Sequence, residues 1–128
     1  MTVQFNHTII LSSDNERSAQ FLADMLDRPA PKPMFHFMVV ELDNGVSLDF
    51  ITMEGDIASR HFAFLVDDAV FDHGMARIKE LGMQFWADPA GKHEGEINHN
   101  DGGRGVYFRD PDGHYLEMIT TPYGVPKS

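Results

Sequence analysis

The pentapeptide Leu48-Asp49-Phe50-Ile51-Thr52 recurs as Leu116-Glu117-Met118-Ile119-Thr120, and this repeat decides the fold. Each copy ends a segment typical of a β-strand, near the end of one half of the chain. The two halves also begin alike, with alternating strand-like segments at 3–11 and 61–66 that contain His7 and His61. The sequence therefore contains two copies of one structural unit, and an offset of 54 residues superimposes their histidines (61 − 7 = 54).

A helix is expected after each histidine-bearing strand. The first is expected from Asp14 to Arg28, with Ser13 and Glu16 forming a capping box at its start. The second is expected over residues 68–81, where apolar side chains recur at helical spacing. Each helix follows its histidine at the same distance, which supports the repeat.

Three further strands are expected after each helix. They fall near 32–35, 37–42 and 46–52 in the first half, and near 84–87, 105–109 and 114–121 in the second half. The sequence thus predicts an α+β fold of two tandem βαβββ modules, at about 3–52 and about 60–121. We expect them to form a single domain over 1–128, with a curved mixed sheet around a metal-binding cleft. The second half is longer because of a loop over 88–104.

Composition narrows the classes of function. The chain has 128 residues, a formal net charge of −10 and no cysteine. The negative charge argues against nucleic-acid or anionic-membrane partners. The lack of cysteine excludes disulfides, thiolate nucleophiles and thiolate metal ligands. No apolar run has the length of a membrane span and no secretory signal begins the sequence, so we expect a cytoplasmic protein.

The repeat predicts where chemistry could occur. Two modules related by a pseudo-twofold axis would bring His7, His61, Asp49 and Glu117 to one concave surface. Two imidazoles and one or two carboxylates suit Fe(II), Mn(II), Ni(II) or Zn(II). The same histidines could instead be hydrogen-bonded core residues. Asp49, one methylene shorter than glutamate, is either a ligand, a group behind the ligands, or a base.

Two more residues are candidates. Tyr107 precedes Glu117 by ten residues across the Asp110-Pro111-Asp112-Gly113 turn, so the hairpin should fold it back toward Glu117. Its phenol could hydrogen-bond a substrate oxygen, or simply lie on the sheet. His99 is in the long loop and could close over the site. The remaining histidines are expected at the surface or an edge: His36, His73, His93 and His114.

These features resemble the vicinal oxygen chelate superfamily, which includes glyoxalase I, extradiol ring-cleaving dioxygenases, fosfomycin-resistance thiol transferases and bleomycin-resistance proteins. The resemblance covers about residues 3–121. Its most specific part is His99 followed, after six residues, by Val106 through Glu117. This spacing is similar to the signature of type I extradiol dioxygenases.

The resemblance implies His7, His61 and Glu117 as ligands of a divalent metal, with Fe(II) favoured over Mn(II), Ni(II) or Zn(II). It implies an extradiol-type dioxygenase that acts on a vicinal diol, with Tyr107, His99 and Asp49 as catalytic groups. Asp49 stands where those dioxygenases usually have histidine. A glyoxalase I-like lyase, with Asp49 as a fourth ligand, is therefore an alternative. A non-catalytic drug- or metabolite-binding resistance protein is a second alternative. The expected partners are a small-molecule substrate and a second copy of the chain in a homodimer, because module edges need covering.

Overall fold

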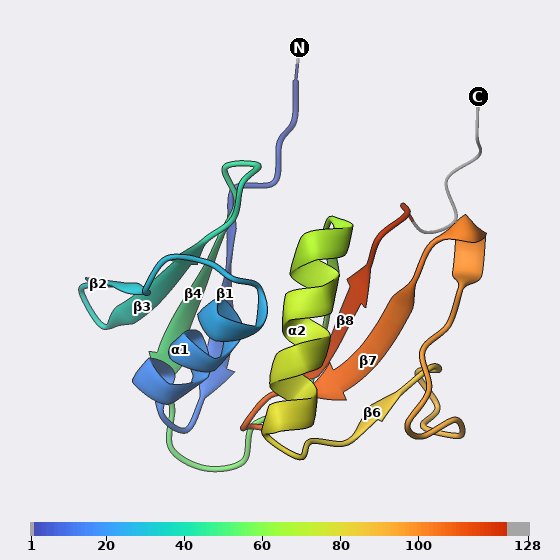
Figure 1. The fold of residues 1–128 in the computed structure, drawn as a ribbon. Helices are drawn as coiled ribbons and strands as arrows, with labels where there is room; N and C mark the ends of the chain where they lie inside the picture. Colours follow the sequence, from blue (N-terminus) through green and yellow to red (C-terminus); the bar gives the residue numbers. More distant parts are fainter. Residues whose placement is uncertain (1, 123–128) are drawn as a thin grey trace. The chain divides into compact units, whose positions relative to one another are not determined.

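The structure is a computed structural model that describes residues 2–122, so the outermost residues of the expected 1–128 domain lie outside it. The described chain divides into two compact units, one up to Ala58 and one from Ser59 onward. Each unit contains one copy of the repeat, with a helix beside a sheet (Figure 1). None of the described helices has the length and apolar character needed to cross a membrane.

The first unit is a βαβββ module. Its elements are β1 (His7–Ser12), α1 (Asn15–Met25), β2 (Lys32–Met34), β3 (Phe37–Glu41) and β4 (Ser47–Thr52). The sheet order is β1-β4-β3-β2, and β1 runs parallel to β4 while the other pairs are antiparallel. One face of the sheet is apolar and buried, with Ile10, Val40, Leu48 and Phe50 each no more than 3% exposed.

The second unit repeats this topology. Its elements are β5 (His61–Leu65), α2 (Asp68–Glu80), β6 (Phe85–Trp86), the short 3₁₀ helix η1 (Asn100–Gly102), β7 (Gly105–Arg109) and β8 (Tyr115–Ile119). The order is β5-β8-β7-β6, again with the first pair parallel. The predicted α+β fold of two tandem βαβββ modules, each with a mixed sheet, is therefore confirmed.

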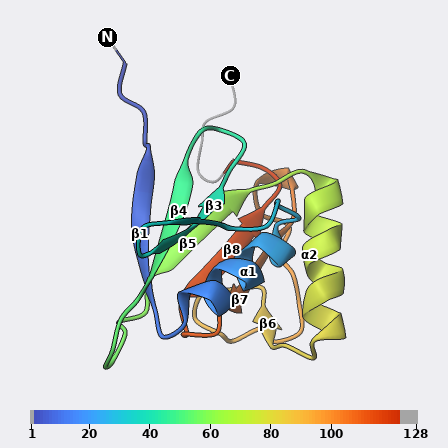
Figure 2. The same ribbon diagram turned by 90° about the vertical axis from the view of Figure 1, so that its left-hand side faces the viewer.

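Alternation along the strands separates the two faces of the second sheet. Val106, Phe108, Leu116 and Met118 occupy even positions, and each is at most 3% exposed. Helix α2 stands against this face, as two perpendicular views show (Figures 1 and 2), and it buries its own apolar side chains there. The odd positions of β7 and β8 therefore lie on the opposite face.

Both helices begin at an aspartate. The side chain of Asp14 accepts a hydrogen bond from the amide of Arg17, and that of Asp67 accepts one from the amide of Val70. The expected capping box with Ser13 is therefore wrong, because the next residue supplies the cap. The hydroxyl of Ser13 instead accepts a hydrogen bond from the guanidinium of Arg17.

The first helix is shorter than expected. It ends at Met25, because Asp27 has a left-handed backbone with φ of 53°. The amide of Arg28 then bonds to the carbonyl of Ala23, which closes the helix with a Schellman motif. Gly82, with φ of 63°, closes α2 in the same way. The helix was expected to continue to Arg28, whereas the left-handed residue ends it earlier.

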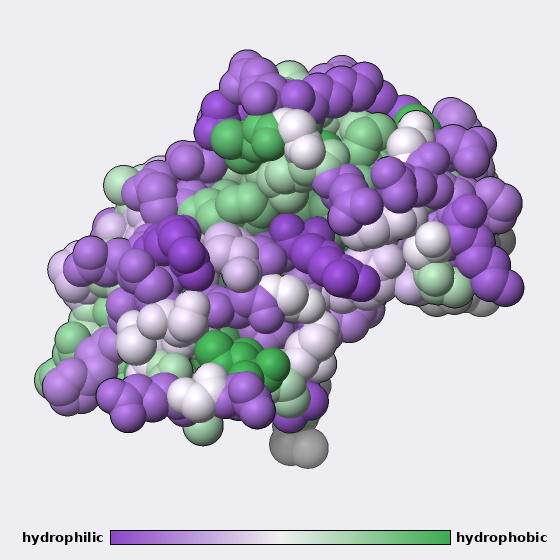
Figure 3. Space-filling model, turned by 90° about the horizontal axis from the view of Figure 1, so that it is seen from below, coloured by the Kyte–Doolittle hydropathy of each residue, from purple (hydrophilic) through white to green (hydrophobic). Residues whose placement is uncertain are grey.

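The surface is mainly polar, in keeping with the net charge of −10. On the face shown in Figure 3, hydrophilic residues surround smaller hydrophobic areas. Some large apolar side chains are nevertheless exposed, including Phe35 at 93% and Phe5 at 65%. Isolated apolar side chains of this kind are normal on a protein surface.

Two aliphatic side chains, one in α2 and one directly after it, test which residues form the core of the second unit. Ile78 is fully buried, whereas Leu81 is 52% exposed. Ile78→Ala should lower the free energy of unfolding by about 2–5 kcal/mol, since it leaves a cavity under the helix. Leu81→Ala is the matched control and should change it by about 0.5 kcal/mol or less. Urea denaturation measures both, and equal losses would contradict the assigned core.

Candidate metal and substrate site

Six side chains gather on the face of the second sheet opposite α2, which we call the aromatic face. Cross-strand pairing places them in two neighbouring rows. One row runs from Arg109 through Tyr115 to His61, and the next runs from Trp86 through Tyr107 to Glu117. The parallel pairing of β5 with β8 is what brings His61, from the start of the unit, beside Glu117 from its end.

His61 and Glu117 form a polar contact on the aromatic face. The Nε2 atom of His61 lies 3.1 Å from Oε1 of Glu117. The Nδ1 atom of the same ring lies 3.2 Å from the carbonyl oxygen of Tyr115. The imidazole is about half exposed and the carboxylate is largely buried, with side-chain exposures of 48% and 10%.

Both neighbours of the His61 ring are hydrogen-bond acceptors. If Nδ1–H donates to the carbonyl of Tyr115, a neutral ring presents its Nε2 lone pair to the carboxylate of Glu117. In the other neutral tautomer, Nε2–H donates to Oε1 of Glu117. The pair is therefore a His–Glu hydrogen bond whose two atoms are also candidate metal ligands.

Tyr107 lies directly opposite Glu117 across the β7–β8 hairpin. Its ring stacks on that of His61, with centroids 6.0 Å apart and an interplanar angle of 27°. The residue is only 8% exposed. The hairpin thus brings Tyr107 to Glu117 as the turn in the sequence predicts, whereas its role toward a substrate stays a prediction.

Tyr115, Trp86 and Arg109 complete the aromatic face. The ring of Tyr115 contacts those of Trp86 and Tyr107, with centroids 6.0 and 5.8 Å apart. Burial raises the pKa of the Tyr115 phenol, although the positive charge of Arg109 acts in the opposite direction. Neither Trp86 nor Arg109 was expected from the sequence to be a site residue. Arg109 follows Tyr107 by two residues, so strand alternation alone could have placed both on one face.

The first unit carries the other predicted residues on its own sheet. His7 is exposed, and its Nδ1 lies 2.7 Å from Oδ1 of Asn6; in the tautomer that donates from Nδ1 to this oxygen, Nε2 is an acceptor. Asp49 is 5% exposed and accepts a 2.8 Å hydrogen bond from the hydroxyl of Ser47. The register His7↔Ser47 and Ile9↔Asp49 puts both on one face of that sheet.

The structure therefore brings only some of the predicted ligands together. Within residues 2–122, three or more histidine or acidic side chains do not gather at one point. His61 and Glu117 meet in the second unit, while His7 and Asp49 share a face in the first.

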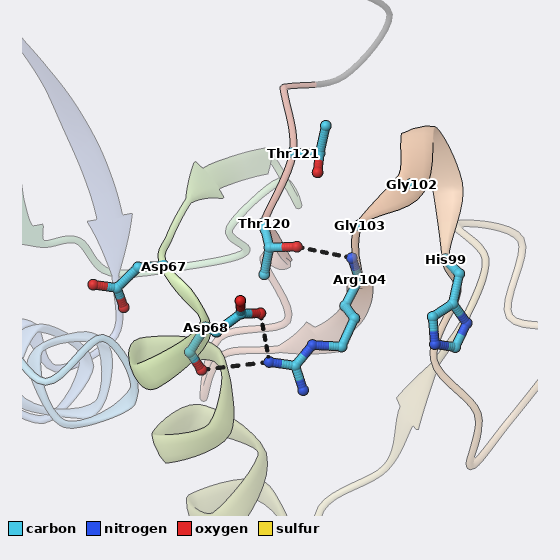
Figure 4. Close-up of a pocket in the computed structure, with 8 residues that line it drawn as sticks. All are labelled: Asp67, Asp68, His99, Gly102, Gly103, Arg104, Thr120 and Thr121. Carbon is cyan, nitrogen blue, oxygen red and sulfur yellow. Dashed lines mark hydrogen bonds and ion pairs between the residues drawn. The ribbon is translucent and has the colours of Figure 1, made fainter.

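His99 lies at the end of the long loop, on a pocket of the second unit (Figure 4). The pocket is also lined by Asp67, Asp68, Gly102, Gly103, Arg104, Thr120 and Thr121. Figure 4 shows the guanidinium of Arg104 turned toward Asp68, with His99 on the other side of Arg104. Salt bridges of 2.8 Å hold Arg104 to Asp68 and to Asp72. The hydrogen bond with Asp72 is the main cause that raises the pKa of Arg104.

The position of His114 differs from the one expected from the sequence. The residue was expected at the surface or an edge, but it is only 1% exposed. Its Nδ1 accepts a 3.0 Å hydrogen bond from the amide of Arg60, which ties the start of β5 to the hairpin. The carboxylate of Asp110 accepts hydrogen bonds from the amides of Asp112 and His114. Burial nevertheless raises the pKa of Asp110. These two residues of the tight turn are structural.

The repeated βαβββ module and the contact of His61 with Glu117 are features of one class of proteins. Comparisons with known proteins show which class this is. "Oxidase ChaP-H1" is similar over 97% of this chain and 100% of its own, with 55% identity and a TM-score of 0.94. "Fosfomycin resistance protein FosX" of Mesorhizobium japonicum is 40% identical over 60 residues. That match covers 47% of this chain and only 38% of FosX.

A third protein is similar to this chain in its fold alone. "Crystal structure of a glyoxalase/dioxygenase from Nostoc punctiforme" is 21% identical and covers 93% of this chain and 91% of its own, with a TM-score of 0.67. No family model matches the sequence. The chain belongs to the vicinal oxygen chelate superfamily, as its repeat and its structural relatives together show.

The close approach of the His99 segment to β8 is testable. Gly103 has an ordinary extended backbone, with φ of −117°. A Cβ atom there would come closer than 3.0 Å to the hydroxyl oxygens of Thr120 and Thr121. Gly103→Ala should therefore lower the free energy of unfolding by about 1–3 kcal/mol, for steric reasons.

The double variant Gly103→Ala/Thr121→Ala is the matched control, because it removes one of the two obstructing side chains. We expect it to recover part of the stability, with a coupling of about 0.5 kcal/mol or more in a double-mutant cycle. Strict additivity of the two changes would show that the segment does not lie against Thr121.

Proposed function

We propose that this chain is a metal-dependent oxidative enzyme, most similar to an extradiol ring-cleaving dioxygenase that acts on a vicinal diol. The contact of His61 with Glu117 carries the proposal, because an imidazole nitrogen and a carboxylate oxygen, both common metal ligands, lie 3.1 Å apart. The 55% identity to a protein named as an oxidase supports oxidative chemistry over lyase chemistry.

The ligand atoms fit a divalent ion of the first transition series. Ligand nitrogen and oxygen atoms bind such ions at about 2.0–2.2 Å, so two neighbouring ligands at right angles are separated by roughly 3 Å. The measured separation of 3.1 Å matches this arrangement. The carbonyl behind Nδ1 of His61 is the type of partner that orients a ligating imidazole. Imidazole and carboxylate ligands suit Fe(II), which we favour, and also Mn(II), Ni(II) or Zn(II).

We propose His7 as the third ligand, since its Nδ1 is engaged by Asn6 and its Nε2 is the atom left to bind. This assignment requires the two modules, about 3–52 and about 60–121, to act as a single domain over 1–128. The modules pair either within one chain or between the two chains of a homodimer. In either case one His7, one His61 and one Glu117 complete the centre.

The proposed chemistry assigns a separate task to each of the remaining candidate residues. A bound divalent metal would acidify a diol hydroxyl and hold its two adjacent oxygens. Asp49 or His99 would take the released proton and return it later in the reaction. The phenol of Tyr107, opposite Glu117, would donate a hydrogen bond that orients the substrate oxygen.

The proposal is tested first by oxygen uptake. The full chain, purified without oxygen and loaded with Fe(II), should consume oxygen when catechol is added. Isomerisation of a hemithioacetal without oxygen uptake would favour a glyoxalase I-like lyase instead. A chain that takes up no metal would favour a ligand-binding resistance protein.

Removing a ligand should empty the centre. His61→Ala should reduce the metal content from about one equivalent per chain to below a tenth, because the remaining ligands bind too weakly. Circular dichroism should show that the fold is retained. His93→Ala is the control, since His93 is an exposed histidine 3.7 Å from Glu96. A His61→Ala variant with full metal content would contradict the assignment.

Tyr107→Phe removes only a hydroxyl. We expect turnover to fall by roughly tenfold or more, since the substrate oxygen loses its positioned donor. The metal content of the same sample should not change, because the phenol is not a ligand. Oxygen-uptake kinetics with catechol provide the measurement. Unchanged turnover would place the hydroxyl outside the reaction.

A further inference from the structure

Arg109 places a positive charge on the aromatic face beside the proposed metal centre. It is exposed and lies opposite Tyr115, which in turn lies opposite His61 on the other side. Arg109 and His61 are thus two strands apart in one row, which corresponds to roughly 10 Å between their backbones. A substrate that spans the row could touch both groups.

Aromatic rings support the guanidinium of Arg109. Its Cζ atom lies 5.4 Å from the ring centre of Trp86 and 5.5 Å from that of Tyr115. Both distances are within the range of cation–π contacts. A planar guanidinium that rests on rings is held in place while its N–H groups stay available for hydrogen bonds.

The charge of Arg109 is not cancelled by a carboxylate of the described chain. The ion pairs found within residues 2–122 do not include one to Arg109. Asp88, whose charge acts on Tyr115, accepts hydrogen bonds from the amides of Lys92 and His93. By contrast, the guanidinium of Arg104 is neutralised by Asp68 and Asp72. Arg109 is therefore suited to an acidic group from outside the chain.

We propose that Arg109 determines specificity by binding an acidic substituent, such as a carboxylate, on the ring of an aromatic substrate. The inference rests on the proposed function, because the diol of the same ring would be held at His61 and Glu117. The rings of Tyr115 and Trp86 form the surface between the two attachment points. A bidentate guanidinium–carboxylate pair would fix the ring along the row.

The experiment compares two probes that differ in one acidic group, catechol and 3,4-dihydroxybenzoate. Their dissociation constants are measured by calorimetry on the Fe(II)-loaded full chain without oxygen. The wild type should bind 3,4-dihydroxybenzoate about tenfold more tightly than catechol. Arg109→Met should remove most of this difference while the affinity for catechol changes less than twofold. Arg109→Lys should give an intermediate affinity, because it keeps the charge but loses the planar fork.

Arg77→Met is the matched control. It removes one positive charge from α2, which covers the opposite face of the sheet, and should leave both affinities unchanged. Trp86 is the only tryptophan of the chain, so its fluorescence reports occupancy of the aromatic face directly. Binding of 3,4-dihydroxybenzoate should change this fluorescence in the wild type.

Each outcome has a distinct meaning. Selective loss of affinity for 3,4-dihydroxybenzoate in Arg109→Met supports the proposal. Equal affinities for the two probes, or equal losses in Arg109→Met, overturn the role of Arg109 and leave the diol site intact. If the metal-loaded chain binds neither probe, the proposed function fails and the role of Arg109 fails with it.

Discussion

The parallel pairing of β5 with β8 fixes the position of His61 relative to Glu117 in the second unit. It puts His61 one strand from Tyr115 and diagonally next to Glu117, although 56 residues separate His61 from that glutamate. Successive side chains of β8 then alternate between the two faces of the sheet. Leu116 and Met118 enter the core beneath α2, which forces the intervening Glu117 to the opposite face. A carboxylate is kept largely buried there because the surrounding apolar packing stabilises the strand that carries it.

A largely buried carboxylate needs hydrogen-bond donors or a cation, and this need connects the fold with the proposed chemistry. The ring of His61 lies within hydrogen-bond distance of Glu117, and in the proposed function both groups bind a metal. His61 and Glu117 lie in the second unit, and the other histidine and acid of the repeat, His7 and Asp49, lie in the first unit. In the proposed function, His7 joins His61 and Glu117 as a metal ligand.

Much of this could be predicted from the sequence, because the repeat and strand alternation are local patterns. They predicted the two modules, the position of Tyr107 opposite Glu117 and the shared face of His7 and Asp49. What they missed depends on tertiary contacts. The burial of His114 requires the amide of Arg60, 54 residues away, and the end of α1 depends on a left-handed Asp27. Arg109 contacts Trp86 and Tyr115 on two other strands, β6 and β8, and strand pairing rather than spacing along the chain sets these contacts.

The central claim is that one divalent metal ion lies at His61 and Glu117. Anomalous X-ray scattering at the iron absorption edge, from crystals of the full chain loaded with Fe(II) without oxygen, tests it most directly. We predict one strong peak per chain within about 2.0–2.2 Å of Nε2 of His61 and of an oxygen of Glu117, with His7 as the third protein ligand. A peak elsewhere, or a His61–Glu117 hydrogen bond with no peak beside it, would contradict the account.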